Sequence, residues 1–144
     1  MNQNCFSNVL QALQPYAKKK LNEYRKYGQN SLTKSLFDDE KAPFDLYKHF
    51  LSALNFYTDE KFLDTDLKET QLDFTFDMDL TDQIISYIDS VFEKFYQFEI
   101  DLLKNPDEFN KRKGFISIII MHTNFHCGQA LRLQAIYGRQ MLKN

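Results

Sequence analysis

The chain has no tryptophan and little glycine or proline, with only 4 Gly and 3 Pro among its 144 residues. Glycine and proline supply most of the backbone conformations that tight turns need, and an all-β fold needs many such turns. Their scarcity therefore favours a helical protein. A chain of this length can build one sizeable core but is too short to expect two, so we expect a single domain over residues 1–144.

Long apolar runs are also missing. The longest lies within Phe115–Met121 and is far shorter than a membrane span. The chain begins MNQNCFSNVLQALQPY, without a basic segment followed by an apolar stretch, so no secretory signal is visible. We therefore expect a cytoplasmic protein with no membrane partner. The two cysteines, Cys5 and Cys127, form neither a disulfide framework nor a CxxC redox pair.

The sequence also lacks the excess of positive charge that nucleic-acid binding requires. Its formal net charge is -2, whereas general nucleic-acid binders carry a basic footprint. The charges are nevertheless uneven: residues 59–79 are rich in Asp and Glu, and a basic patch opposed only by Glu23 lies near the N-terminus. The basic residues are Lys18, Lys19, Lys20, Arg25 and Lys26. We interpret both segments as solvated faces, with docking patches for a partner as the alternative.

Four segments show helical patterns. Residues 5–27 form the first and are closed by Gly28, while Pro15 predicts either a kink or a start close to itself. The second covers 43–57 and places Pro43 at the favoured first position. Its apolar stripe has spacings of four, four and three: Leu46, Phe50, Leu54 and Tyr57.

Residues 72–80 alternate between apolar and polar, which is the period of a strand. The rest of the chain offers no partner strand, so we expect an extended connector laid over the helices. Thr81 is the predicted cap of the third helix, which ends before Asn105. That helix carries a four-three apolar seam: Ile84, Ile88, Val91, Phe95, Phe98 and Leu102.

The fourth helix is expected to start at Asn105, with Pro106 at its first position. Gly114 is a candidate interruption near this start. From Phe115 onward the pattern is apolar on most sides and then amphipathic, and Gly138 is the expected stop. The sequence therefore predicts an all-α fold, a four-helix bundle.

The three histidines of the chain are the main candidates for chemistry. His122 and His126 are four residues apart on the predicted last helix, so their imidazoles point the same way and can share one metal ion. His49, on another core-facing helix, completes a possible three-nitrogen site, and facing helices are where bundles build metal sites. The alternative is that each histidine is a hydrogen-bonded core residue.

The run His122-Thr-Asn-Phe-His126-Cys-Gly-Gln129, followed by a helix that reaches Gly138, resembles the last helix of the DinB/YfiT-like superfamily. The resemblance implies an up-down-down-up four-helix bundle, often a homodimer, with a three-histidine site for nickel or zinc. It also implies an earlier histidine on the second helix, which His49 matches. The chain departs from the family at Cys127, where Arg or Lys is frequent, and at Phe125, where another His is frequent.

A site of three neutral imidazoles leaves a coordination position open, as in catalytic metal centres. That position can hold a water with a pKa of about 7 or a thiolate. The resemblance implies a small-molecule substrate and either hydrolysis or transfer with a low-molecular-weight thiol. Asp45 and Ser52 share a face with His49, and Gln129 follows His126 by three residues. These three are candidates for supporting roles, with surface or packing as the alternative, and Cys127 is interpreted as a packed residue.

Two other functions stay open. One is a non-catalytic, dimeric helical bundle with a stress-related binding or structural role, and the other is a sensor that uses the metal only as a ligand. A subunit interface could draw on an aromatic-rich set: Phe92, Phe95, Tyr96, Phe98 and Phe109.

Overall fold

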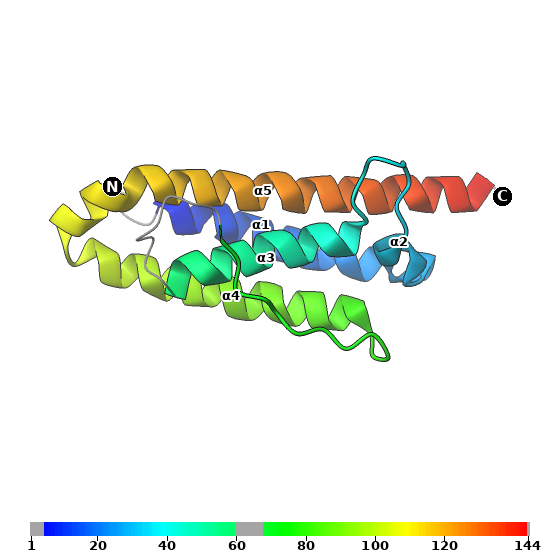
Figure 1. The fold of residues 1–144 in the computed structure, drawn as a ribbon, viewed down its shortest axis with the longest axis horizontal. Helices are drawn as coiled ribbons and strands as arrows, with labels where there is room; N and C mark the ends of the chain where they lie inside the picture. The colour runs from blue at the N-terminus through cyan, green and yellow to red at the C-terminus, as the bar shows by residue number, and fades with distance from the viewer. Residues whose placement is uncertain (1–4, 60–67, 144) are drawn as a thin grey trace.

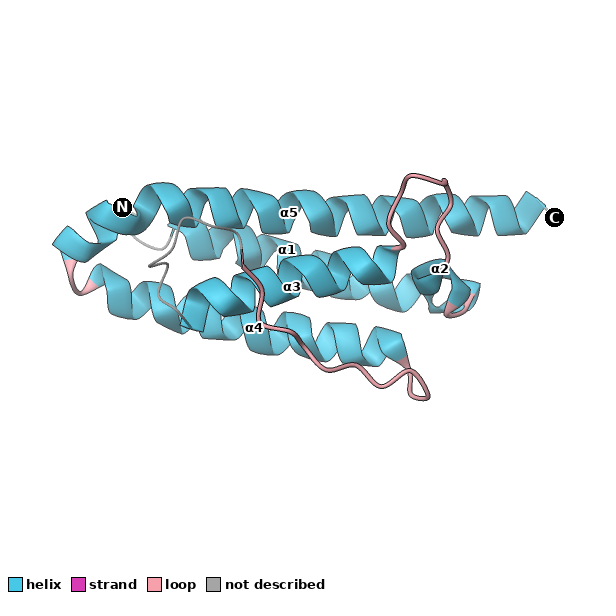
Figure 2. Cartoon of the chain, in the orientation of Figure 1, coloured by secondary structure: helices cyan, strands magenta, loops and turns pink. Residues whose placement is uncertain are grey.

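The computed structural model describes residues 5–59 and 68–143, and all regular structure in these ranges is helical. The elements are α1 (Cys5–Tyr24), the 3-10 turn η1 (Arg25–Tyr27), α2 (Asn30–Thr33), α3 (Pro43–Asp59), α4 (Leu80–Leu103) and α5 (Pro106–Lys143). The described residues contain no strand (Figure 2). The all-α expectation is therefore confirmed. Part of the predicted acidic segment, residues 60–67, lies outside the described residues.

The four long helices lie along the long axis of the molecule (Figure 1). α1 and α5 run in one direction, and α3 and α4 run in the other. α1 and α3 each pack against both α4 and α5, and the contact between α3 and α5 is the most extensive. The two helices that carry the histidines are therefore neighbours.

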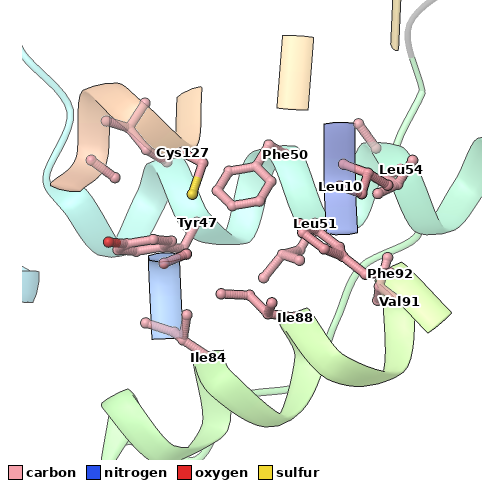
Figure 3. Close-up of a cluster of buried hydrophobic side chains, with 14 of the residues drawn as sticks. Leu10, Tyr47, Phe50, Leu51, Leu54, Ile84, Ile88, Val91, Phe92 and Cys127 are labelled. Atoms are coloured by element: carbon pink, nitrogen blue, oxygen red, sulfur yellow. The ribbon is translucent and has the colours of Figure 1, made fainter. Parts of the chain in front are cut away.

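The core lies between these helices, and the predicted apolar stripes point into it. Leu46, Phe50, Leu54 and Tyr57 of α3 are all buried. On α4 the first four seam residues, Ile84 to Phe95, are buried, while Phe98 and Leu102 are partly buried. Figure 3 shows one part of this cluster, where α3, α4 and α5 side chains meet. Each fully buried side chain of this size contributes about 1.5–3 kcal/mol to folding.

The first helix starts where the expected range of 5–27 has it. α1 begins at Cys5 and runs through Pro15, so the alternative of a start near Pro15 is wrong. Gly28 does end this segment: its φ is 77°, a left-handed conformation that favours glycine, and its N–H donates to the Arg25 carbonyl at 3.0 Å. The short helix α2 then lies between α1 and α3, in a segment for which the sequence predicted no helix.

The cap of α4 is Asp79 and not the predicted Thr81. The Asp79 carboxylate accepts a hydrogen bond from the Asp82 N–H at 3.0 Å, while Thr81 is buried. Arg25 pairs with Asp79 at 3.2 Å, and the Leu80 N–H donates to the Gln29 side chain at 2.7 Å. Arg25 of η1 and Gln29 after it therefore bind the start of α4. These are tertiary contacts, which no local pattern in the sequence reveals.

α5 begins as predicted but is longer. The Asn105 side chain accepts from the Glu108 N–H at 3.3 Å, which confirms the cap. The helix passes through Gly114 without a break and continues past Gly138 to Lys143, so neither glycine interrupts or ends it. Gly138 has a packing role instead: the ring of Tyr27 occupies the space where a Cβ would stand.

Residues 68–79 form a connector without helix or strand over α3 and α4 (Figure 1). It contains most of the segment 72–80, for which we expected an extended connector, whereas Leu80 is the first residue of α4. Phe74 packs edge-on against Phe44 of α3, with 4.9 Å between ring centroids, and against Tyr87 of α4 at 5.0 Å. The Tyr87 hydroxyl donates to the Asp73 carbonyl at 2.7 Å. At its start, the Thr70 N–H donates to the Ser52 carbonyl of α3 at 3.1 Å. The connector is thereby tied to the face of α3 that carries His49.

Across the described residues, no helix combines the length and apolarity that crossing a membrane requires.

Candidate metal centre

The three histidines meet between α3 and α5. His49 projects from α3, and His122 and His126 from one face of α5. One nitrogen of each ring lies within 4.8 Å of one nitrogen of each other ring. The closest pair is Nε2 of His49 and Nε2 of His122, 2.9 Å apart. All three rings are half-buried, so the site is shielded without being sealed from solvent.

Two side chains outside this triad decide which ring nitrogens face it. Nδ1 of His49 lies 2.7 Å from Oε1 of Glu69, and a carboxylate can only accept, so this nitrogen carries a proton and, in the neutral ring, Nε2 is the atom with the lone pair. Nδ1 of His126 lies 3.0 Å from Oε1 of Gln129. The Gln129 amide nitrogen donates to Glu40 at 3.5 Å, which fixes the orientation of the amide. In their neutral forms, His49 and His126 therefore each present an Nε2 lone pair toward the site.

His122 is held neutral. Burial lowers its pKa from 6.5 to about 4, and the neighbouring His126 and His49 rings act in the same direction. Its Nδ1 is buried and has no hydrogen-bond partner. The Nε2 atoms of His49 and His122 lie 2.9 Å apart, so they cannot both present bare lone pairs to each other. A neutral His122 that carries its proton on Nε2 can donate it to His49, and a metal cation bound by both nitrogens is the alternative.

The residues fit a divalent transition metal. Three neutral imidazoles suit zinc, nickel, copper or iron, whereas magnesium and calcium prefer oxygen ligands. Ligand nitrogens at the usual Zn–N distance of about 2.0–2.1 Å stand about 3.3 Å apart in a tetrahedral site. The 2.9 Å between the His49 and His122 nitrogens is close to that spacing. The oxygen atoms of Glu69 and Gln129 are then the hydrogen-bond acceptors that metal-ligating histidines usually have.

Of the residues predicted to support the triad, one contacts it and two do not. Gln129 contacts His126, as the spacing suggested. Asp45 and Ser52 line a pocket of about 190 Å³ beside His49, together with Glu69, but neither hydrogen-bonds to a triad histidine. Glu69 was missed because it lies on the connector, twenty residues after His49. The acidic character of 59–79 was visible, yet no spacing rule connects one of its carboxylates to a helix face.

Cys127 takes no part in the site. It is fully buried and lies beside Tyr47 and Phe50 in the core (Figure 3). Burial raises the pKa of its thiol to about 12, so the reactive thiolate is scarce at neutral pH. The interpretation of Cys127 as a small packed residue is confirmed.

Comparisons of the chain with protein-family models, with curated proteins and with solved structures give no match. The observation that bears on function is therefore the geometry of the three histidines.

Proposed function

We propose that this protein is a DinB/YfiT-like, metal-binding four-helix bundle with the up-down-down-up arrangement. His49, His122 and His126 are the metal ligands, with nickel or zinc as the metal. The observation that carries the proposal is the convergence of one nitrogen from each histidine within 4.8 Å. The helix directions in Figure 1 support the bundle, because α1 and α5 run opposite to α3 and α4.

The activity that we propose is hydrolysis or the transfer of a low-molecular-weight thiol to a small-molecule substrate. A bound metal with an open position would supply a site where water or a thiol is held in its deprotonated form. The chain's own residues do the rest: the three imidazoles hold the ion, and Glu69 and Gln129 hold two of the rings in place by hydrogen bonds. The histidines are ligands in this proposal, and none acts as a general base.

A second candidate is a non-catalytic homodimer. It is favoured by an exposed apolar surface on α5 formed by Ile118, Met121 and Phe125, which are 60%, 68% and 65% exposed. The aromatic set that we expected to supply an interface does not do so as a whole, because Phe92 and Phe95 are fully buried in the core.

The test of metal binding is elemental analysis of protein purified without a metal-affinity tag. We expect about one nickel, zinc or iron per chain, and loss of that metal in His122→Ala. Asn124→Ala is the matched control, because Asn124 is exposed on the same helix turn and should retain the metal. Absence of stoichiometric metal in the parent protein would overturn the proposal.

The activity is tested separately, with the metal-loaded protein, by measuring thiol consumption with glutathione, bacillithiol or mycothiol against a panel of electrophiles. Turnover that disappears in His122→Ala but not in Asn124→Ala would support catalysis. A metal-loaded protein without turnover that forms stable dimers, broken by Phe125→Ser, would favour the non-catalytic candidate.

A further inference from the structure

A second concave surface lies between α1 and α5. It is a groove of about 250 Å³, open to solvent and slightly smaller than most small-molecule sites. α1 contributes residues at intervals of four, and α5 contributes residues over about three turns. The lining residues are Tyr16, Lys20, Tyr24, Gly128, Leu131, Arg132, Ala135 and Arg139.

The groove is strongly basic in a protein whose net charge is -2. Lys20, Arg132 and Arg139 carry three positive charges, and Glu23, which pairs with Lys20 at 3.4 Å, carries one negative charge, leaving +2. Arg132 and Arg139 form no ion pair or hydrogen bond with the described residues, in contrast to Lys18 of the same region, which pairs with Asp89 at 2.9 Å. Two guanidinium groups are therefore free to bind an anion.

Small residues keep the floor of the groove open. A Cβ added at Gly128 would meet nothing within 4 Å, and Ala135 lies two turns further along α5. The α1 wall is aromatic: Tyr16 is 54% exposed, and Tyr24 stacks on Tyr27 with 5.7 Å between ring centroids. The groove thus combines cations, flat aromatic surfaces and free volume.

This groove is separate from the metal centre. The triad lies where α5 packs against α3, whereas the groove lies where α5 packs against α1. Of the three cationic side chains in the groove, Arg132 is six residues from the nearest triad histidine along the chain and points to a different side of the helix.

We propose that the groove between α1 and α5 binds an organic polyphosphate that carries a planar ring, as a nucleoside diphosphate does. Arginine forks bind phosphate oxygens in pairs, and residues seven apart on a helix stand about 10.5 Å apart along its axis. That separation suits a chain of two or three phosphates better than a single phosphate. Tyr16 or Tyr24 offers the face on which the ring stacks. An open groove of about 250 Å³ can hold part of such a molecule, with the rest in solvent, and is far too small for a nucleic-acid duplex.

The experiment is isothermal titration calorimetry of the full chain with ADP, pyrophosphate and inorganic phosphate. We expect one ADP site per chain, with ADP bound more tightly than pyrophosphate and pyrophosphate more tightly than phosphate. The double variant Arg132→Gln/Arg139→Gln should bind ADP at least about tenfold more weakly, because each arginine contributes charge-assisted hydrogen bonds. Tyr16→Ala should remove much of the preference for ADP over pyrophosphate.

The matched control is Lys104→Gln/Lys113→Gln, which removes the same charge from exposed positions outside the groove and should bind ADP as the parent does. Gly128→Leu is a second, independent variant that fills the floor and should also abolish binding, with circular dichroism to verify folding. The proposal is overturned if the parent does not bind ADP at millimolar concentration or if the control loses affinity as much as the arginine variant. It is also overturned if the groove is instead buried in a dimer that Arg132→Gln/Arg139→Gln dissociates.

Discussion

Glu69 and Gln129 each hold one triad ring through its Nδ1 atom, at 2.7 Å and 3.0 Å. Glu69 is the more informative of the two, because its hydrogen bond joins the connector to α3. Nearby, the Thr70 N–H bonds to the Ser52 carbonyl, which holds the connector in place. Glu69 is therefore a positioning residue for His49.

Replacing Glu69 with Ala should weaken zinc binding by about 10–100-fold, the usual effect of removing an acceptor behind a ligating histidine. The Nδ1 proton of His49 would lose its partner and the ring its fixed orientation. The zinc affinity of Glu69→Gln should lie between those of the parent and Glu69→Ala, since an amide oxygen still accepts the hydrogen bond but carries no charge. The measurement is competition for Zn²⁺ against a chromogenic chelator.

The control for Glu69→Ala is Asp45→Ala. Asp45 lines the same pocket and carries the same charge but makes no hydrogen bond to His49. Equal weakening in both variants would show that long-range charge, and not the hydrogen bond, is responsible.

Unlike Glu69, the carboxylate of Glu99 on α4 is fully buried, and it lies under the start of α1. Its Oε1 accepts from the Ser7 N–H at 3.2 Å, whereas its Oε2 is buried without a hydrogen-bond partner. The Ser7 hydroxyl is likewise buried without a partner. Burial raises the pKa of Glu99 above 4.5, and hydrogen bonding to Ser7 opposes this shift.

Glu99→Gln should stabilise the protein at pH 7.5 by about 1 kcal/mol, because an amide keeps the acceptor, offers a donor and buries no charge. Since the native pKa lies above the unfolded value of 4.5, the native state holds this proton over a pH window in which the unfolded chain has lost it. The parent therefore loses stability as pH rises through that window. Urea denaturation at pH 4.5 and 7.5 should show the advantage of Glu99→Gln only at the higher pH, while Glu93→Gln, at an exposed position of α4, should show none.

At the scale of elements, the contact between α5 and the turn after α1 depends on a single glycine. The Tyr27 ring lies against Gly138, and the same ring stacks on Tyr24 with an interplanar angle of 21°. The ring is held on one side by an aromatic neighbour, so it has little freedom to move away from a new side chain.

Gly138→Ala should destabilise the protein by about 1–3 kcal/mol, although alanine is the better helix former, because its methyl group would overlap the Tyr27 ring. Gly114→Ala is the control: it lies in the same helix with nothing within 4 Å of the new Cβ and should gain about 0.5–1 kcal/mol. When Tyr27 is also replaced by Ala, Gly138→Ala should no longer destabilise the protein. Thermal denaturation of the parent, the three single variants and the Tyr27→Ala/Gly138→Ala double variant measures this, and a stabilising Gly138→Ala in the parent would contradict it.

Local signals in the sequence predicted the elements well and their ends less well. The apolar periods of α3 and α4 and the Asn105 cap of α5 are local properties, and the structure confirms them. Gly138 was wrongly predicted to end the helix. A glycine that leaves room for the ring of a residue far away in the sequence cannot be told from a helix-ending glycine by sequence alone. The Asp79 cap of α4 was also missed. Two contacts from residues far away in the sequence support it: Arg25 pairs with Asp79, and Gln29 accepts from the Leu80 N–H.

The candidate site likewise has parts that local spacing predicts and parts that depend on contacts between distant residues. His122 and His126 share a helix face by spacing alone, so their proximity was predictable. The place of His49 depended on the resemblance to DinB/YfiT-like proteins, and the structure brings it to 2.9 Å from His122. Glu69 could not be predicted, because the path of an extended connector over α3 is decided by contacts such as Phe74 with Phe44 and not by a period.

At the scale of the whole molecule, the triad joins helices that are far apart in the chain. His49 and His122 are 73 residues apart, and both the connector and α4 lie between them in sequence. A metal held by both α3 and α5 therefore acts as a cross-link that the unfolded chain cannot reproduce with the same affinity. Metal binding and global stability should be linked.

Zinc should accordingly raise the melting temperature of the metal-free protein. At a free concentration of about 100 times Kd the native state gains about 2.7 kcal/mol. For a domain of this size that gain corresponds to roughly 10 °C. Calorimetry with and without Zn²⁺ measures the shift, and EDTA should reverse it. His49→Ala and His122→Ala should each remove most of it, one from α3 and one from α5, which shows that the cross-link needs both helices. An undiminished shift in His49→Ala would mean that α5 binds zinc alone, and the proposed three-histidine centre would then be wrong.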